Sequence, residues 1–175
     1  IEARHTTLSR SSGAVKLPGP EAFEGIRTAG QPSASCLDML VEEPTHKWLV
    51  PSPSGSPENG FVLVNGRALL HDGKPKPPEG VRNSITMGVA MDNQLLRDVF
   101  TQTLQAATEL SVDAPLQSEL RAALPRLAPH QVRADGTLME WLKPWKEFDP
   151  KHRHVSHLYA FYPSNQITRR GTPAL

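Results

Sequence analysis

The hydrophobic positions between Val89 and Leu110 recur at the spacing of a helix. They lie three to five residues apart, at Met91, Leu95, Val99, Leu104, Ala107 and Leu110. Leu96 and Phe100 widen the same apolar stripe. Such a stripe is typical of an amphipathic helix that buries one face. The pattern therefore predicts a helix over residues 89–110.

A second helix is predicted from about Asp113 to Leu124. Asp113 is a favourable N-cap residue, and Pro115 falls in the first turn, where its missing N–H is tolerated. The leucines of this segment share one face of the expected helix: Leu116, Leu120 and Leu124. Two shorter helices are expected around residues 21–27 and over residues 156–161 before Pro163. The apolar run 36–41 fits the end of another helix, which Pro44 stops.

The segment 61–70 has the pattern of a β-hairpin. Asn65-Gly66 separates two apolar runs, and this dipeptide is the strongest short-range signal for a tight hairpin turn. Residues 48–50 form a short extended piece, and the Pro- and Gly-rich stretch 51–60 fits neither a helix nor a central strand. We therefore expect a mainly α fold with long irregular connections and a small hairpin. Residues 1–35 are expected to form an irregular N-terminal segment, separate from residues 36–175.

Composition and charge exclude several classes of protein. Hydrophobic residues make up 38% of the 175 residues, which is enough for one ordinary core. The net charge of +1 gives no basic surface for a nucleic acid. No apolar run approaches the roughly 20 residues that span a bilayer, so membrane insertion is not expected. The single cysteine, Cys36, cannot form an internal disulfide and leaves the compartment open.

Both ends of the sequence have the character of cut ends. The chain opens at Ile1 without a methionine and closes at Leu175, shortly after a helix start signal. We therefore expect a fragment or a processed product. Its localisation and its oligomeric state stay unknown.

Glu58 is the first candidate for chemistry. It follows Pro57 in the Ser-Pro-Glu-Asn turn, and the fixed φ of the proline holds the carboxyl group in one direction. A fixed direction suits a proton donor that has to stay within reach of one oxygen. The alternative is an ordinary, solvent-exposed loop glutamate.

A second candidate segment runs from Asp135 to Trp145. Trp141 and Trp145 stand four residues apart beside Glu140, so they could form a wall for a sugar ring whose hydroxyl protons the carboxylate accepts. The alternative is a tryptophan pair that fills the core between helices. The sequence favours neither interpretation.

Three histidines lie close together at positions 152, 154 and 157. A helix would place only His154 and His157 on one face, and neither HExxH nor CxxC occurs, so we predict no metal site. Hydrogen bonding to a sugar suits these imidazoles better, with Arg153 as a planar donor. GxGxxG, GxxxxGK and GxSxG are absent as well, and no cofactor is expected.

The order of several short blocks resembles glycoside hydrolase family 95. These blocks are Trp48-Leu49-Val50, Ser56-Pro57-Glu58-Asn59, Ile85-Thr86-Met87-Gly88 with Met91-Asp92, Leu95 to Phe100, Asp135-Gly136, Glu140-Trp141-Leu142, Asp149 to Leu158, and Tyr162-Pro163 with Asn165-Gln166-Ile167. Each block is weak alone, and their common order over residues 36–175 carries the resemblance. Residues 1–35 do not fit what the family has there.

The resemblance implies a partial (α/α)6-barrel catalytic domain of an inverting exo-α-L-fucosidase. Its substrate would be a fucosylated oligosaccharide or glycan, with fucose or galactose preference left open. Glu58 falls on the family's general acid. Binding roles carry over to the polar and aromatic residues of the same blocks: Asn59, Asp92, Glu140, Trp141, His152, Arg153, His154 and His157.

The family's catalytic base does not fall within this sequence. The resemblance places an asparagine pair upstream and an aspartate downstream of these residues. Inversion needs an activated water on the face of the sugar opposite the acid. An incomplete barrel would also leave helix faces unburied. We therefore expect the chain by itself to be marginally stable and nearly inactive. The alternative to an enzyme is a non-catalytic helical module that binds carbohydrate or another protein.

Overall fold

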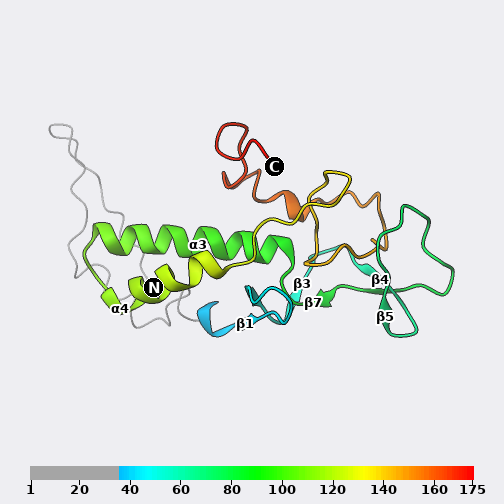
Figure 1. Cartoon of the computed structure of the whole chain (residues 1–175), viewed down its shortest axis with the longest axis horizontal. Helices are drawn as coiled ribbons and strands as arrows, with labels where there is room; N and C mark the ends of the chain where they lie inside the picture. Colours follow the sequence, from blue (N-terminus) through cyan, green and yellow to red (C-terminus); the bar gives the residue numbers. More distant parts are fainter. Residues whose placement is uncertain (1–35) are drawn as a thin grey trace, which may run out of the picture. The chain divides into compact units, whose positions relative to one another are not determined.

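Two antiparallel helices form the most regular part of the structure, a computed structural model that describes residues 36–175. Helix α3 spans Ala90–Glu109 and helix α4 spans Ala114–Ala123. They lie side by side (Figure 1). The shared core holds the buried residues Leu96, Phe100, Leu116, Leu120, Ala123 and Leu127. Both helices are confirmed, but α3 contributes Leu96 and Phe100 to the buried core, whereas Met91 and Leu95 of the predicted stripe are not part of it.

The turn between the helices is held by Asp113. Its side chain accepts a hydrogen bond from the backbone N–H of Leu116 at 3.4 Å, and its φ of 55° lies in the left-handed region. Aspartate tolerates this conformation better than most residues. Pro115 occupies the first turn as predicted, and the 3-10 helix η2 (Leu124–Arg126) continues from α4.

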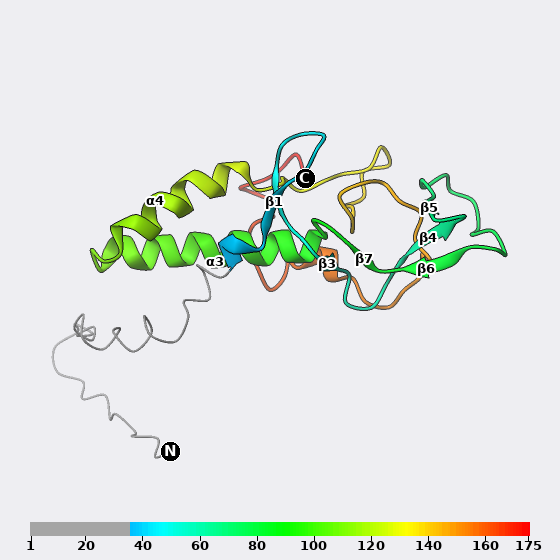
Figure 2. The same ribbon diagram turned by 90° about the horizontal axis from the view of Figure 1, so that it is seen from below.

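Seven short strands form three small antiparallel sheets in the described residues. Strand β1 (Leu40–Glu42) pairs with β2 (Leu49–Pro51), and β3 (Ser54–Gly55) pairs with β7 (Ile85–Thr86). The third sheet has the order β5-β4-β6, formed by Arg67–Ala68, Phe61–Val64 and Val81–Asn83. Strands β3, β7 and the third sheet lie beyond the N-terminal end of α3 (Figure 2).

The predicted hairpin is strands β4 and β5. Val64 pairs with Arg67, and Asn65 and Gly66 take positive φ values of 50° and 72°. Two consecutive residues with positive φ define the turn whose twist matches that of the strands. Register and turn both follow from the Asn-Gly dipeptide.

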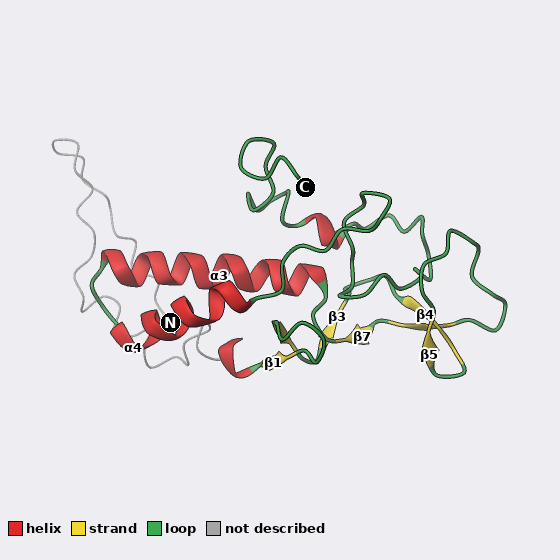
Figure 3. Cartoon of the chain, in the orientation of Figure 1, coloured by secondary structure: helices red, strands yellow, loops and turns green. Residues whose placement is uncertain are grey.

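The expectation of a mainly α fold is only partly confirmed. The described residues contain the seven strands as well as helices α3 and α4, and long loops follow α4 (Figure 3). In the run 36–41 only residues 36–38 are helical, since Leu40 and Val41 pair with Pro51 and Val50 in β1. The expected short helix at residues 21–27 lies outside the described residues.

The third helix is also shorter than predicted. Only Ser156–Leu158 forms a helix, the 3-10 helix η3, and turns follow it. The side chain of Gln94 accepts a hydrogen bond from the N–H of Ala160 at 3.0 Å. This contact replaces the backbone acceptor that an α-helix would supply. No helix in the described part of the chain is long and apolar enough to cross a membrane.

Candidate active site

The Ser-Pro-Glu-Asn turn is held from below by Arg82 of strand β6. The Arg82 guanidinium donates to the carbonyl oxygens of Glu58 and Asn59, the latter at 3.1 Å. A Cβ atom on Gly60 would lie 2.6 Å from Arg82 Cγ, so glycine is required for the arginine to cross. Arg82 reaches this position because β6 pairs with β4, and the turn directly precedes β4 in the chain. Sequence reasoning did not find Arg82, because nothing near it marks a site.

The carboxyl group of Glu58 is in direct contact with His154. Glu58 Oε2 faces His154 Nδ1, and the two side chains are 46% and 42% exposed. The carboxyl group is therefore partly open to solvent and still directed at the histidine segment. The sequence prediction that these distant residues act together is consistent with this contact.

Arg153 determines which nitrogen of the His154 ring carries the proton. Arg153 Nε donates to His154 Nε2 at 3.0 Å. A neutral imidazole that accepts at one nitrogen carries its proton on the other. His154 therefore presents Nδ1–H to Glu58 Oε2, and Oε1 stays available for the proton of a carboxylic acid.

A hollow of about 460 Å³, here called the first hollow, opens beside Glu58. It is lined by Pro57, Glu58, Asn59, Met91, Glu140, Arg153, His154, Val155 and Ser156. Four of the predicted binding residues thus surround the predicted acid. The hollow joins the turn before β4, the start of α3 and the histidine segment.

A second hollow, of about 270 Å³, shares Asn59, Glu140, His154 and Val155 with the first. It adds His152 and His157. Nδ1 of His157 is buried and has no hydrogen-bond partner among the described residues. Burial lowers the pKa of His157 and nearby Arg133 lowers it too, against the opposing effect of Glu140. His157 is consequently a neutral imidazole at neutral pH, able to bond a hydroxyl group.

Glu140 lies between the two hollows, and its carboxylate is buried at 4% exposure. It accepts hydrogen bonds from Ser56 Oγ and, at 3.1 Å, from Asn59 Nδ2. Asn59 Oδ1 in turn accepts from the N–H of Gly60 at 2.8 Å. Glu140 therefore fixes the Glu58 turn as well as lining the hollows. Ser56, which takes part in this contact, was missed in the sequence.

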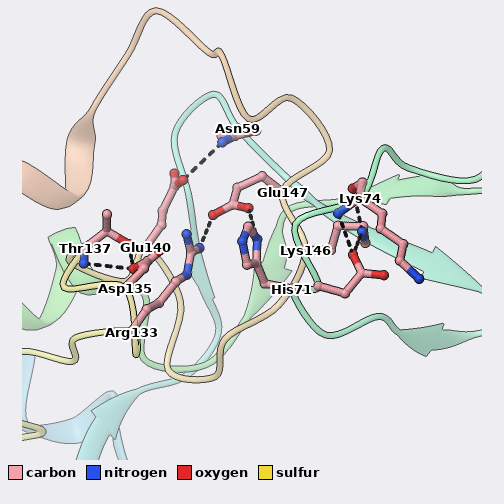
Figure 4. Close-up of polar contacts among 10 residues, drawn as sticks. Asn59, His71, Lys74, Arg133, Asp135, Thr137, Glu140, Lys146 and Glu147 are labelled. Carbon is pink, nitrogen blue, oxygen red and sulfur yellow. Dashed lines mark hydrogen bonds and ion pairs between the residues drawn. The ribbon is translucent and has the colours of Figure 1, made fainter.

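Arg133 and Glu147, which both line the second hollow, form an ion pair (Figure 4). Arg133 donates to Glu147, which also contacts His71 Nδ1 at 3.2 Å. Arg133 and Glu147 are 13% and 12% exposed. The charges of Arg133 and Glu147 are largely shielded from water, so the two side chains orient each other. Glu140 keeps its own hydrogen bonds to Ser56 and Asn59.

Gln94 of helix α3 anchors the histidine segment. Its side-chain amide donates to the carbonyl oxygen of His157 at 2.8 Å, and its own carbonyl oxygen in the backbone accepts from Gln166 Nε2 at 2.7 Å. Gln94 is buried. This glutamine connects the start of α3 to the site, and no pattern in the sequence singled it out.

Two predicted binding residues have other positions. Trp141 is 1% exposed and packs with Phe61 and Val89, so the core interpretation holds for it and its ring cannot cover a bound sugar. Its burial follows from the edge contact with Phe61, 5.8 Å between ring centroids. Trp145 packs on the same Phe61 ring at 4.3 Å. Asp92 accepts from Ser54 Oγ at 2.6 Å and is not among the described residues that line either hollow.

The helical argument against a metal site does not apply to the structure. Residues 150–155 are not helical, so the face shared by His154 and His157 does not exist. Instead His152 and His154 come together, with 5.3 Å between ring centroids, and Glu58 joins them.

The two hollows place a carboxyl group beside imidazoles, an amide and a second carboxylate, which are donors and acceptors suited to the hydroxyl groups of a sugar. In sequence comparison, residues 31–175 match the model of the family described as "Glycosyl hydrolase family 95 catalytic domain". The chain belongs to this family. It is also 28% identical to the protein named "Alpha-L-fucosidase 2" of Arabidopsis thaliana. The alignment extends over 172 residues, which is 98% of this chain. The chain spans 18% of the length of that relative.

Proposed function

We propose that this chain supplies the general acid and part of the sugar-binding site of an inverting exo-α-L-fucosidase. The substrate is a glycan that ends in α-linked L-fucose, as the family and the fucosidase relative suggest. In this proposal α3 and α4 are one helical pair of an (α/α)6 barrel. The observation that carries the proposal is the contact of the Glu58 carboxyl group with His154 at the edge of the first hollow.

The proposed chemistry is a single displacement. Glu58 transfers its proton to the glycosidic oxygen while the bond to the anomeric carbon breaks, and a water attacks from the opposite face of the sugar. His154 Nδ1–H donates to Oε2, so the transferable proton sits on Oε1. The same hydrogen bond strengthens as Glu58 becomes a carboxylate, because bonds to charged acceptors are the stronger ones.

The remaining polar groups have binding roles in this proposal. His152, His157 and Arg153 face the two hollows and offer donors and acceptors for sugar hydroxyl groups. Asn59 and Glu140 hold the turn that carries the acid. Trp141 and Asp92 act from outside the hollows, by packing and by fixing the start of α3.

The alternative of a non-catalytic carbohydrate-binding module has less support. Binding modules usually hold sugar rings on exposed aromatic planes. Of the two candidate tryptophans, Trp141 is buried and Trp145 packs on the ring of Phe61. The activated water of the enzyme requires groups outside this chain in our proposal. Turnover is therefore to be measured on the complete gene product.

The test is Glu58→Gln in the complete gene product, with Glu79→Gln as a matched control on an exposed loop. On fucosides with poor leaving groups, kcat should fall by about 10²–10⁴, since that is the usual contribution of a general acid. On α-L-fucosyl fluoride, which needs little protonation, most of the rate should remain. Equal losses on both substrates would show that Glu58 is not the acid.

A further inference from the structure

Glu58, His152 and His154 bring their polar atoms together from two segments far apart in the sequence. One side-chain donor atom from each lies within 4.8 Å of those of the other two. The two imidazole rings stand edge to face, and His154 already contacts the Glu58 carboxylate. Few geometric changes are needed for all three to bind one ion.

Two imidazoles and a carboxylate are a familiar set of ligands for a transition metal. Zn²⁺ binds such ligands at about 2.0–2.2 Å and keeps one position open when the protein provides three. Tetrahedral ligand atoms at these bond lengths stand roughly 3.4 Å apart. Small rotations of half-exposed side chains cover the difference from the observed spacing, and the first hollow leaves room for a fourth, non-protein ligand.

Arg153 opposes metal binding in the present arrangement. Its Nε–H donates to His154 Nε2, which keeps the proton of that ring on Nδ1. A metal ion at Nδ1 replaces this proton, and Nε2 then carries the proton of the ring. A protonated Nε2 cannot accept the hydrogen bond from Arg153. The guanidinium also repels the ion. Arg153 is exposed, so it can turn away at little cost.

From this arrangement we propose that Glu58, His152 and His154 form a binding site for a divalent transition-metal ion of the Zn²⁺ type, and that Arg153 limits its affinity. The proposal stands on the three converging ligands and does not require that the chain hydrolyse a sugar. If Glu58 is the acid, the bound metal holds its carboxyl group ionised and the metal inhibits turnover.

The test is calorimetric titration of the full chain with ZnCl2 in a non-chelating buffer at neutral pH. Cys36→Ser serves as the background, because a free thiol also binds zinc. One ion should bind per chain, and His152→Ala or His154→Ala should each weaken binding at least tenfold. His46→Ala, which removes an exposed histidine outside the cluster, should leave the affinity unchanged.

Arg153→Ala sharpens the test, because here the variant should bind better than the parent. Removal of the competing donor and charge should tighten zinc binding several-fold. Lys151→Ala removes the same charge two residues away and should change the affinity much less. Either of two results would overturn the proposal: no binding of Zn²⁺, or binding that the His152 and His154 variants leave intact. The effect of Glu58→Gln on turnover tests the proposed function separately, and neither zinc-binding result changes it.

Discussion

The helical pair and the loops around Glu58 are held together by different interactions. Helices α3 and α4 meet mainly through a hydrophobic cluster, and Gln117 and Arg121 of α4 add side-chain hydrogen bonds to the C-terminal end of α3. The site instead depends on single polar contacts from distant segments: Arg82 under the Glu58 turn, Glu140 on Ser56 and Asn59, and Gln94 on the histidine segment. Apolar packing tolerates small shifts, whereas a polar contact depends on direction and distance.

This difference separates stability from function within one chain. Removal of an apolar side chain should affect the helical pair in proportion to the volume lost. Removal of a buried polar side chain should cost the energy of the partners left without hydrogen bonds. The two kinds of substitution therefore test whether the regions really differ.

The largest effect is expected for Phe100→Ala in the helical pair. Phe100 is 0% exposed at the centre of the cluster. Replacing a buried phenylalanine with alanine costs about 3–5 kcal/mol of unfolding free energy. Urea denaturation followed by circular dichroism measures this loss. Gln102→Ala, on the exposed face of the same helix, should change stability by less than about 0.5 kcal/mol. A small effect of Phe100→Ala would mean that the helices are not the stable part.

The next effect is expected at Glu140 in the loop region. Glu140→Ala leaves the Ser56 hydroxyl and the Asn59 amide buried without an acceptor, which should cost about 2–4 kcal/mol. Glu140→Gln is the matched control, since its oxygen can accept from Asn59 while its amide donates to Ser56 Oγ. The glutamine should therefore recover most of the loss in the same urea experiment. Equal losses in the two variants would show that hydrogen bonding does not hold this turn.

The same difference explains which elements the sequence could predict. Helix α3 was predictable because its whole apolar stripe lies in one segment, and the hairpin was predictable because Asn65-Gly66 carries its own backbone preference. Leu40 and Val41 were assigned wrongly because their structure depends on pairing with Pro51 and Val50 of β2. Local patterns define local elements, and the partner decides the rest.

The site was predictable only in part. Family resemblance, and not spacing, linked Glu58 to the histidine segment. The burial of Trp141 depends on Phe61 and Val89, which lie far away in sequence, so the two interpretations of the tryptophans could not be separated. Arg82 and Gln94 act on backbone N–H and carbonyl groups, which leave no residue pattern in the sequence. Such supporting contacts become visible only when the chain is folded.

The smallest effect is expected for Gly66→Ala, which tests the loop region without touching a contact. Gly66 has a φ of 72°, and an added Cβ atom would meet nothing within 4 Å. The cost is therefore that of the left-handed backbone alone, about 1 kcal/mol. Asn65→Gly, one residue earlier at a φ of 50°, keeps access to the same conformation and should change stability by less than about 0.5 kcal/mol. Urea denaturation of both variants provides the measurement. If Gly66→Ala is neutral, the strands of the hairpin tolerate another turn, and the backbone of the loop region is less strictly determined than its polar contacts.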